Sequence, residues 1–227
     1  LDDYARLLTV FEDRCPKPWI MVGHSMGAAL NLLSLQAGET RFAGALLSSP
    51  MLRVKTGKHS MWSVKLAVRW NIRHGKAGDY VLDEPDDPFG HTFKKDALTS
   101  DEGRYELWRQ QMYACPHLAI GGTTWGWLAF ALDAGERALK LKALKSVRIP
   151  VTVVQAADDD RVWKQTSRWA TKRLPHGRYV EIGGAQHEVL MERDDLRAEA
   201  FREFEALAER VAPAGAEQNR VELEAAG

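Results

Sequence analysis

The sequence lacks several features that mark particular classes of protein. It has only two cysteines among 227 residues, Cys15 and Cys115, and their wide separation fits neither a disulfide framework nor a metal-binding spacing. It contains no apolar run of the roughly 20 residues that span a bilayer, and it does not begin with a secretory signal. These absences favour a cytoplasmic protein with free thiols.

An excess of charge is also missing. The 31 Lys and Arg residues balance the 31 Asp and Glu residues, and we find no block of like charge. Domains that bind nucleic acid usually carry a basic patch or stripe, so nucleic acid is not expected as a partner. The 45% share of hydrophobic residues is enough for one sizeable core, or for a core and a lid.

The stretch Pro18–Gly27 is the most informative part of the chain. Its apolar residues Trp19–Val22 predict a buried strand, and the residues after it predict a helix, with the pattern G-x-S-x-G between the two. Strand, sharp turn and helix in this order are typical of a nucleophile elbow, which exposes a serine hydroxyl above a sheet. We expect Gly23 and Gly27 to be required because side chains there would collide across the turn. Ser25 is therefore the candidate nucleophile.

Strand-like and helical segments alternate in residues 1–50 and 148–212, which predicts a hydrolase core with a parallel sheet flanked by helices. After the elbow strand, the predicted strands are 42–48, 150–155 and 178–182. A long amphipathic helix closes this core and ends before Pro213. Residues 213–227 contain too few apolar residues to pack and are predicted to form a disordered tail.

Residues 51–147 show helical patterns without strand patterns, which predicts a helical cap inserted into the core. Several tryptophans lie in this insertion. Each could simply pack in a small helical core, but together they favour a broad apolar pocket for a chain with a polar end. Trp108, Trp125 and Trp127 are the candidates for lining that pocket.

A serine nucleophile needs a base that accepts its proton and a carboxylate that orients the base. His187 is the best-placed histidine, because it follows the predicted strand 178–182 in a loop that begins with two glycines. His24 is adjacent to Ser25, but neighbouring residues of an extended segment point to opposite faces. We therefore expect His24 to support the core and His187 to act as the base.

The orienting carboxylate belongs to one of three consecutive aspartates, Asp158, Asp159 and Asp160, in the loop after the strand 150–155. Reactive groups in parallel sheets gather on loops at the carboxyl ends of the strands, where Ser25 and His187 are also expected. The aspartates lack the spacing and the central glycine of a calcium loop. No metal and no other cofactor is therefore expected.

Three motifs, GHSMG, QAADDDRV and GGAQHEVLME, together resemble the α/β-hydrolase superfamily, specifically its lysophospholipase and monoacylglycerol lipase branch. The resemblance covers nearly the whole chain and includes segments 97–100, 104–105 and 120–128 of the insertion. It implies an α/β-hydrolase fold, with a mostly parallel sheet, flanking helices and a helical cap.

The resemblance also implies roles for particular residues. The catalytic aspartate of the family directly precedes a basic and an aliphatic residue, which implies Asp160; one added residue in the loop keeps Asp158 and Asp159 as alternatives. The backbone N–H of Met26 is the expected oxyanion donor.

The chain departs from the family at its beginning. Members of this superfamily have further strands before the elbow, and the loop after one of them carries a second oxyanion donor. Only an amphipathic helix, starting at Leu1, is predicted before the elbow strand here. We therefore expect a fragment of a longer hydrolase that lacks its N-terminal strands.

The expected reaction is hydrolysis of a carboxylic ester of a single-chain lipid, either a lysophospholipid or a monoacylglycerol, through an acyl-enzyme. The alternatives are a general carboxylesterase or peptidase of the same fold, and a hydrolase-like binding module with a dead site. A transient contact with a membrane surface is compatible with the tryptophans, although we see no long amphipathic basic helix.

Overall fold

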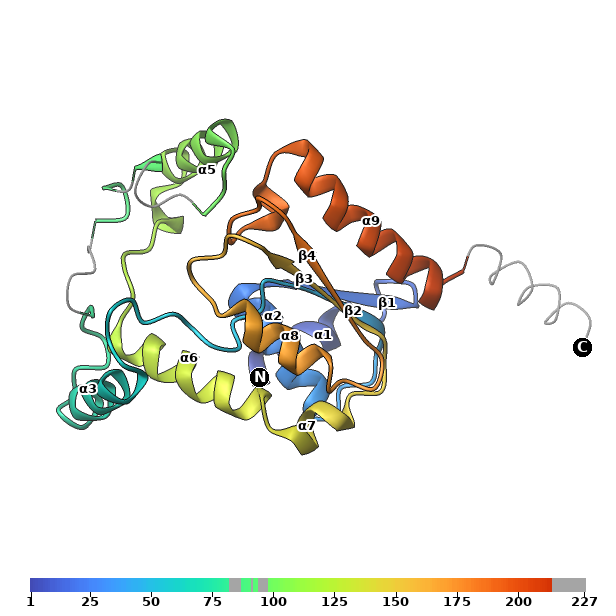
Figure 1. Ribbon diagram of the computed structural model, residues 1–227, viewed down its shortest axis with the longest axis horizontal. Helices are drawn as coiled ribbons and strands as arrows, with labels where there is room; N and C mark the ends of the chain where they lie inside the picture. Colours follow the sequence, from blue (N-terminus) through green and yellow to red (C-terminus); the bar gives the residue numbers. More distant parts are fainter. Residues whose placement is uncertain (82–86, 91, 94–97, 214–227) are drawn as a thin grey trace, which may run out of the picture.

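The computed structural model describes residues 1–81, 87–90, 92–93 and 98–213. Its described residues form a parallel sheet of four strands in the order β1-β2-β3-β4, with helices on both faces (Figure 1). The strands are β1 (Trp19–His24), β2 (Phe42–Ser48), β3 (Val151–Ala156) and β4 (Gly177–Ile182). The predicted strands and their parallel pairing are therefore confirmed.

The core also contains four helices and one 3-10 turn among the described residues. They are α1 (Asp2–Phe11), α2 (Ser25–Gln36), α8 (Lys164–Thr171) and α9 (Asp194–Val211), together with the 3-10 turn η2 (Val189–Met191). Helix α2 connects β1 to β2, and α8 connects β3 to β4. Helix α2 is followed by its capping residue Ala37 and then by Gly38, which has a φ of 101°. Glycine is favoured there because a side chain would strain this left-handed backbone.

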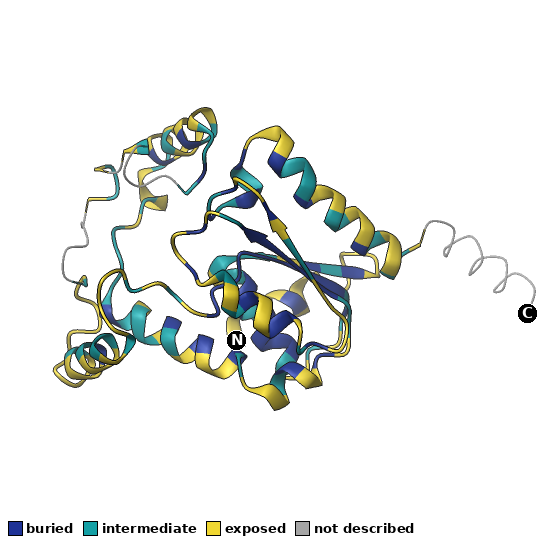
Figure 2. Cartoon of the chain, viewed as in Figure 1, coloured by how far each residue is buried: buried dark blue, intermediate teal, exposed yellow. Residues whose placement is uncertain are grey.

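Two apolar layers enclose the sheet. Helix α9 covers one face through Leu196, Ala200 and Leu207, which pack with buried residues of β2, β3 and β4. Helices α2 and α8 pack against the opposite face, where the larger core cluster lies. Every residue of β3 is buried (Figure 2). A strand covered on both faces is expected to be mostly apolar, and β3 is apolar except at Thr152 and Gln155.

The long segment between β2 and β3 is helical in its described parts. It contains α3 (Met61–Arg73), α5 (Glu102–Ala114), the 3-10 turn η1 (Pro116–Leu118), α6 (Trp125–Ala138) and α7 (Leu141–Ser146). Helix α6 packs between α2 and α3, so α3 lies at the periphery of the molecule (Figure 1). The treatment of residues 51–147 as one cap stays a prediction.

Two expectations concern the rest of the chain. Apart from Pro213, the predicted disordered tail lies outside the described residues. None of the helices in the described ranges is both long and apolar enough to cross a membrane.

Candidate active site

The turn between β1 and α2 has the strained geometry of a nucleophile elbow. Ser25 has a φ of 49°, although it is not a glycine, and it starts α2 directly after the last residue of β1. Non-glycine residues rarely adopt this left-handed conformation, which costs of the order of 1–3 kcal/mol and is often found at active sites. Ser25 therefore lies at a position whose left-handed backbone conformation is unfavourable for a serine.

Gly23 is required by the close approach of α2 to the end of β1. A Cβ atom at this position would lie 2.5 Å from Asn31 Nδ2 and 2.8 Å from the backbone nitrogen of Ala28. The prediction for Gly27 is wrong in its physical reason. Apart from its chain neighbours and the backbone of α2 itself, a Cβ atom at Gly27 would meet no atom of the described residues within 4 Å.

This difference predicts opposite effects for two alanine substitutions. Gly23→Ala should lower the free energy of unfolding by about 1–3 kcal/mol, because backbone atoms of α2 must move. Gly27→Ala should be neutral or raise it by up to about 1 kcal/mol, since alanine is the better helix former. Urea denaturation of both variants, followed by circular dichroism, checks the prediction. Equal losses in the two variants would contradict it.

Three side chains from separate loops form a chain of hydrogen bonds beside this elbow. His187 Nε2 lies 2.9 Å from Ser25 Oγ, and His187 Nδ1 lies 2.9 Å from Asp159 Oδ2. His187 and Asp159 are 4% and 5% exposed, so bulk water does not compete for their hydrogen bond. The parallel sheet brings these residues together because their loops all follow the carboxyl ends of strands.

The loop after β3 holds the Asp159 carboxylate in place. Its Oδ1 accepts the backbone N–H groups of Arg161 and Val162 at 2.9 and 3.0 Å, and its Oδ2 also accepts Gln155 Nε2 at 2.9 Å. Burial by itself raises the pKa of Asp159, but the hydrogen bond and charge of His187 and the two N–H groups outweigh it and lower the pKa. Asp159 is therefore the carboxylate that stays ionised beside His187.

The structure contradicts the assignment of Asp160. The side chain of Asp160 is 68% exposed and pairs with Arg161 at 3.2 Å, while Asp158 is also exposed and contacts Ala185 through its backbone. The alternative left open by the extra loop residue, Asp159, is the one that meets His187. The two backbone N–H groups turn its carboxylate inward, and the side chain of the next residue consequently points to solvent.

His24 occupies a different position from the one expected. Its ring centroid lies 4.8 Å from that of His187 in an edge-on arrangement, and its Nδ1 lies 3.3 Å from Ser48 Oγ. Burial and the neighbouring His187 lower the pKa of His24 to about 4. His24 is therefore neutral near pH 7. Its ring packs against the His187 ring, which contacts Ser25, instead of pointing away from the site.

Two polar residues that support Asp159 were not identified from the sequence. Gln155 is fully buried in β3, and Lys55 donates its Nζ to the backbone oxygen of Asp159 at 2.6 Å. A polar amide in a strand predicted to be buried was a usable signal for Gln155, because such a group needs a partner. Lys55 gave no local signal, since it lies more than a hundred residues away in the sequence.

A buried carboxylate ties the His187 loop to the helical segment. Glu192 is fully buried and accepts the backbone N–H groups of Gln186 at 2.7 Å and Ser100 at 3.0 Å, as well as the Ser100 hydroxyl. Thr99 donates its hydroxyl to the backbone oxygen of Met191 at 2.7 Å. The loop that carries His187 is thus held by residues of the segment between β2 and β3.

The three candidate pocket tryptophans do not form one cluster. Trp125 is buried at the start of α6, Trp127 is 38% exposed, and Trp108 packs on Tyr105 within α5. A groove of about 580 Å³ lies between α3 and α6, and its lining includes none of the three. Their role in binding an acyl chain stays a prediction.

Comparison with known proteins relates the chain to hydrolases. A family model described as serine aminopeptidase, S33, matches residues 1–194. The chain is 27% identical over 214 residues to lysophospholipase L2 of Escherichia coli K12, covering 88% of this chain and 62% of that protein. It is 26% identical over 182 residues to the probable lysophospholipase L2 of Haemophilus influenzae, covering 80% and 56%. The chain thus spans less than two thirds of the length of these curated relatives.

Solved structures show the same fold. A soluble variant of the monoglyceride lipase from Saccharomyces cerevisiae aligns with a TM-score of 0.65 at 18% identity, covering 92% of this chain and 69% of that one. The monoacylglycerol lipase of Paleococcus ferrophilus also aligns with a TM-score of 0.65, at 19% identity, covering 91% and 74%. The predicted α/β-hydrolase fold and the resemblance to the lysophospholipase and monoacylglycerol lipase branch are therefore confirmed.

Proposed function

The chain belongs to the serine aminopeptidase S33 family of hydrolases, and from this premise we propose that it hydrolyses a carboxylic ester of a single-chain lipid. The observation that carries the proposal is the continuous set of hydrogen bonds from Ser25 through His187 to Asp159. This geometry matches the requirements for a serine nucleophile with an oriented base.

In the proposed reaction, Ser25 Oγ attacks the ester carbonyl carbon while His187 Nε2 accepts the hydroxyl proton. Asp159 accepts the Nδ1–H of His187, which keeps Nε2 free to act as the base and stabilises the imidazolium that forms. His187 then delivers the proton to the leaving alcohol, and an acyl group remains on Ser25. Water, activated by the same histidine, hydrolyses this acyl-enzyme and releases the fatty acid.

The start of α2 contributes to stabilising the oxyanion. Met26 follows Ser25 in the first turn of the helix, where backbone N–H groups have no acceptor within the helix. We assign its N–H as a donor to the negative oxygen of the tetrahedral intermediate. The positive end of the helix dipole lies at the same place and acts in the same direction.

The lipid ester is supported by the names of the relatives, since lysophospholipases and monoglyceride lipases release a fatty acid from a lipid with one acyl chain. A second candidate is a peptidase, which the description of the matching family favours. Both reactions begin with attack by the same serine. Lipase and peptidase activity are therefore distinguished by the substrate and not by Ser25, His187 and Asp159.

A comparison of four substrates tests the proposal. Lysophosphatidylcholine, a monoacylglycerol, p-nitrophenyl butyrate and an aminoacyl anilide are supplied separately, and kcat/KM is measured for each. We expect at least one lipid to exceed the short ester by on the order of tenfold or more, because burial of a few methylene groups contributes that much. Preference for the anilide would instead establish the peptidase, and preference for the short ester a general carboxylesterase.

A further inference from the structure

The chain contains a basic segment although its total charge is balanced. Residues 52–78 contain no acidic side chain, while the chain as a whole has equal numbers of both signs. The basic residues of this segment are Arg53, Lys55, Lys58, Lys65, Arg69, Arg73 and Lys76. This segment corrects the expectation that no block of like charge occurs: its basic residues are separated by uncharged residues and do not form a contiguous run.

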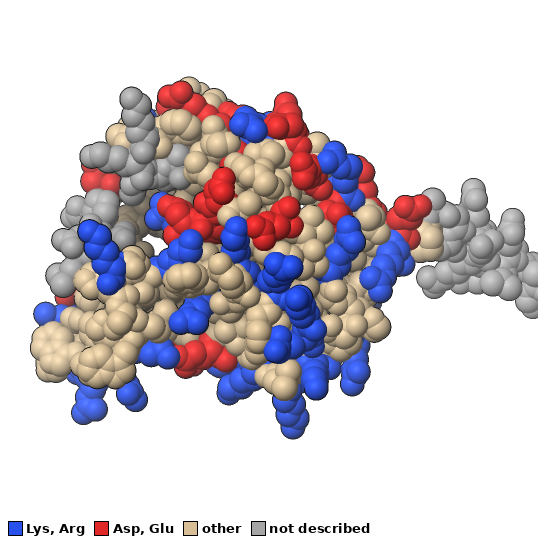
Figure 3. Space-filling model, in the orientation of Figure 1, with Lys and Arg blue, Asp and Glu red and all other residues tan. Residues whose placement is uncertain are grey.

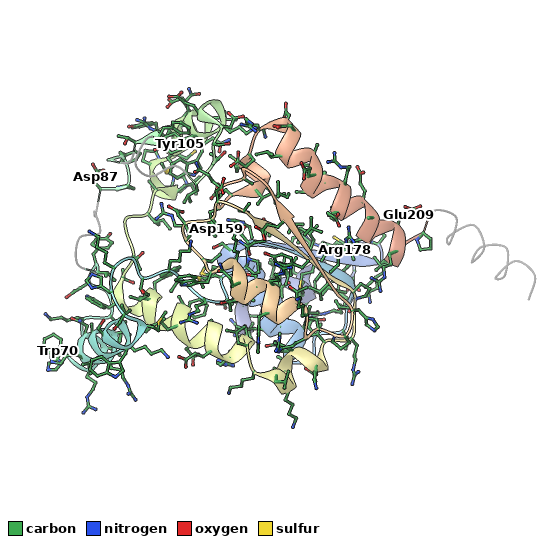
Figure 4. All side chains as sticks on the ribbon, in the orientation of Figure 1. Trp70, Asp87, Tyr105, Asp159, Arg178 and Glu209 are labelled. Atoms are coloured by element: carbon green, nitrogen blue, oxygen red, sulfur yellow. The ribbon has the colours of Figure 1, made fainter. Side chains whose placement is uncertain are left out.

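Helix α3 lies within this segment and exposes large apolar side chains. Trp62, Leu66 and Trp70 are 74%, 55% and 53% exposed. They lie four residues apart and therefore share one face of the helix, while Val68 is buried on the side that packs against α6. Figure 4 shows Trp70 at the outer edge of the molecule, directed away from the body. Single exposed apolar residues are ordinary, but two tryptophans and a leucine on one helical face are not.

Basic side chains flank this apolar face. Arg69 and Arg73 lie on the same side of α3, where they line the groove beside α6 together with Asp133 and Glu136. These two carboxylates pair with Arg137 and Lys65, and neither arginine forms an ion pair with any residue in the described part of the chain. Lys76 lies over the Trp70 ring at 5.4 Å, and His74 stacks on the same ring at 4.2 Å. Figure 3 shows blue basic groups beside tan side chains in this region, at the left of the molecule. The face therefore combines apolar rings with arginines that form no ion pair within the described residues.

We propose that α3 is a docking surface for an anionic lipid bilayer. Trp62, Leu66 and Trp70 enter the interfacial layer, where tryptophan is favoured because its ring is apolar and its N–H is polar. Arg69 and Arg73 contact the lipid phosphates, and the neighbouring lysines add longer-range attraction. The surface is separate from the Ser25 site, so binding does not depend on the proposed hydrolysis.

A bilayer fits this face better than a nucleic acid or a second copy of the chain. Proteins that bind single-stranded nucleic acid stack bases in a groove lined with aromatic and basic groups, whereas Trp62, Leu66 and Trp70 project from the exposed face of a helix and do not line the groove beside α6. A second copy would bring the same cations together, which opposes association. An anionic lipid surface supplies both an apolar layer for the rings and negative charge for the arginines.

The test is co-sedimentation of the protein with vesicles of pure phosphatidylcholine and of phosphatidylcholine mixed equally with phosphatidylglycerol. We expect binding to the anionic vesicles that weakens at high salt. Arg69→Gln/Arg73→Gln should weaken it on the order of twentyfold, because each basic residue near such a surface contributes about fivefold. Trp62→Ala/Trp70→Ala should weaken it by roughly tenfold or more through lost apolar contact.

Trp169→Ala is the matched control, because Trp169 is 39% exposed on α8 and packs on Arg173 instead of facing this surface. It should bind vesicles like the unchanged protein. Circular dichroism and turnover of p-nitrophenyl butyrate establish that each variant is folded. If the Trp62→Ala/Trp70→Ala protein does not fold, the single variant Trp62→Ala replaces it in the binding measurement. Since binding is measured without turnover, an inactive protein that still binds would contradict the proposed hydrolysis only.

Several results would overturn the docking surface. They are absent binding to anionic vesicles, equal binding to both vesicle types, and binding that persists in the α3 variants. Dimerisation in gel filtration that depends on Trp62 would identify a second copy as the occupant. Displacement of vesicles by single-stranded RNA, with tight RNA binding that depends on the same residues, would identify nucleic acid instead.

Discussion

Replacing Ser25 with alanine should reduce kcat for ester hydrolysis on the order of a millionfold while leaving the protein folded. The hydroxyl of Ser25 is the only group that the proposed mechanism uses to form the acyl-enzyme, and loss of a catalytic serine in a triad has effects of this size. Alanine retains the Cβ atom and all backbone hydrogen bonds of α2, so the loss would come from chemistry and not from unfolding. Steady-state hydrolysis of a chromogenic ester and thermal denaturation measure the two effects.

Covalent labelling provides the control for this prediction. A fluorophosphonate should modify Ser25 and no residue of the Ser25→Ala variant. Ser49 is the informative comparison, because it also has a left-handed backbone, with a φ of 39°, and follows β2. Its hydroxyl is fully buried and lies 3.3 Å from the backbone nitrogen of Ala156, so we expect no label there. Retained hydrolysis by the alanine variant, or labelling at Ser49, would contradict the assignment.

The second large effect is expected at Asp159. Asp159→Asn should reduce kcat by roughly ten-thousandfold, because the amide cannot hold the neutral histidine with Nε2 as the acceptor and cannot stabilise the imidazolium. The side chain keeps its shape, so KM should change far less than kcat. Hydrolysis rates measured across a range of substrate concentrations separate the two constants.

Asp160→Asn is the matched control, since it makes the same chemical change one residue further along. The Asp160 carboxylate is exposed and pairs only with Arg161 among the described residues, and such surface pairs contribute little to stability. Its kcat should stay within about twofold of the unchanged protein. A larger loss in Asp160→Asn than in Asp159→Asn would restore the assignment that the family pattern implied.

The contrast between these two residues shows where sequence reasoning reached its limit. The motif around Asp160 indicates the correct loop, because local composition places the end of a strand reliably. It cannot indicate which of three identical side chains turns inward, since that depends on two backbone N–H groups that meet one carboxylate. The same holds for Gly27, where the motif requires a glycine but the described structure shows free space.

The sequence by itself determined the positions of the strands and the order of the core helices. It also determined the strained turn at Ser25 and the choice of His187 as the candidate base. Apolar periodicity and glycine placement are local properties, and a parallel sheet places the ends of its strands together whatever the side chains are. The tertiary structure alone decided that Asp159 meets His187, that Lys55 and Gln155 support it, and that Glu192 ties the histidine loop to Ser100. Each of these contacts, except the short link from Gln155 to Asp159, joins residues far apart in the chain, and their geometry exists only once the sheet has formed.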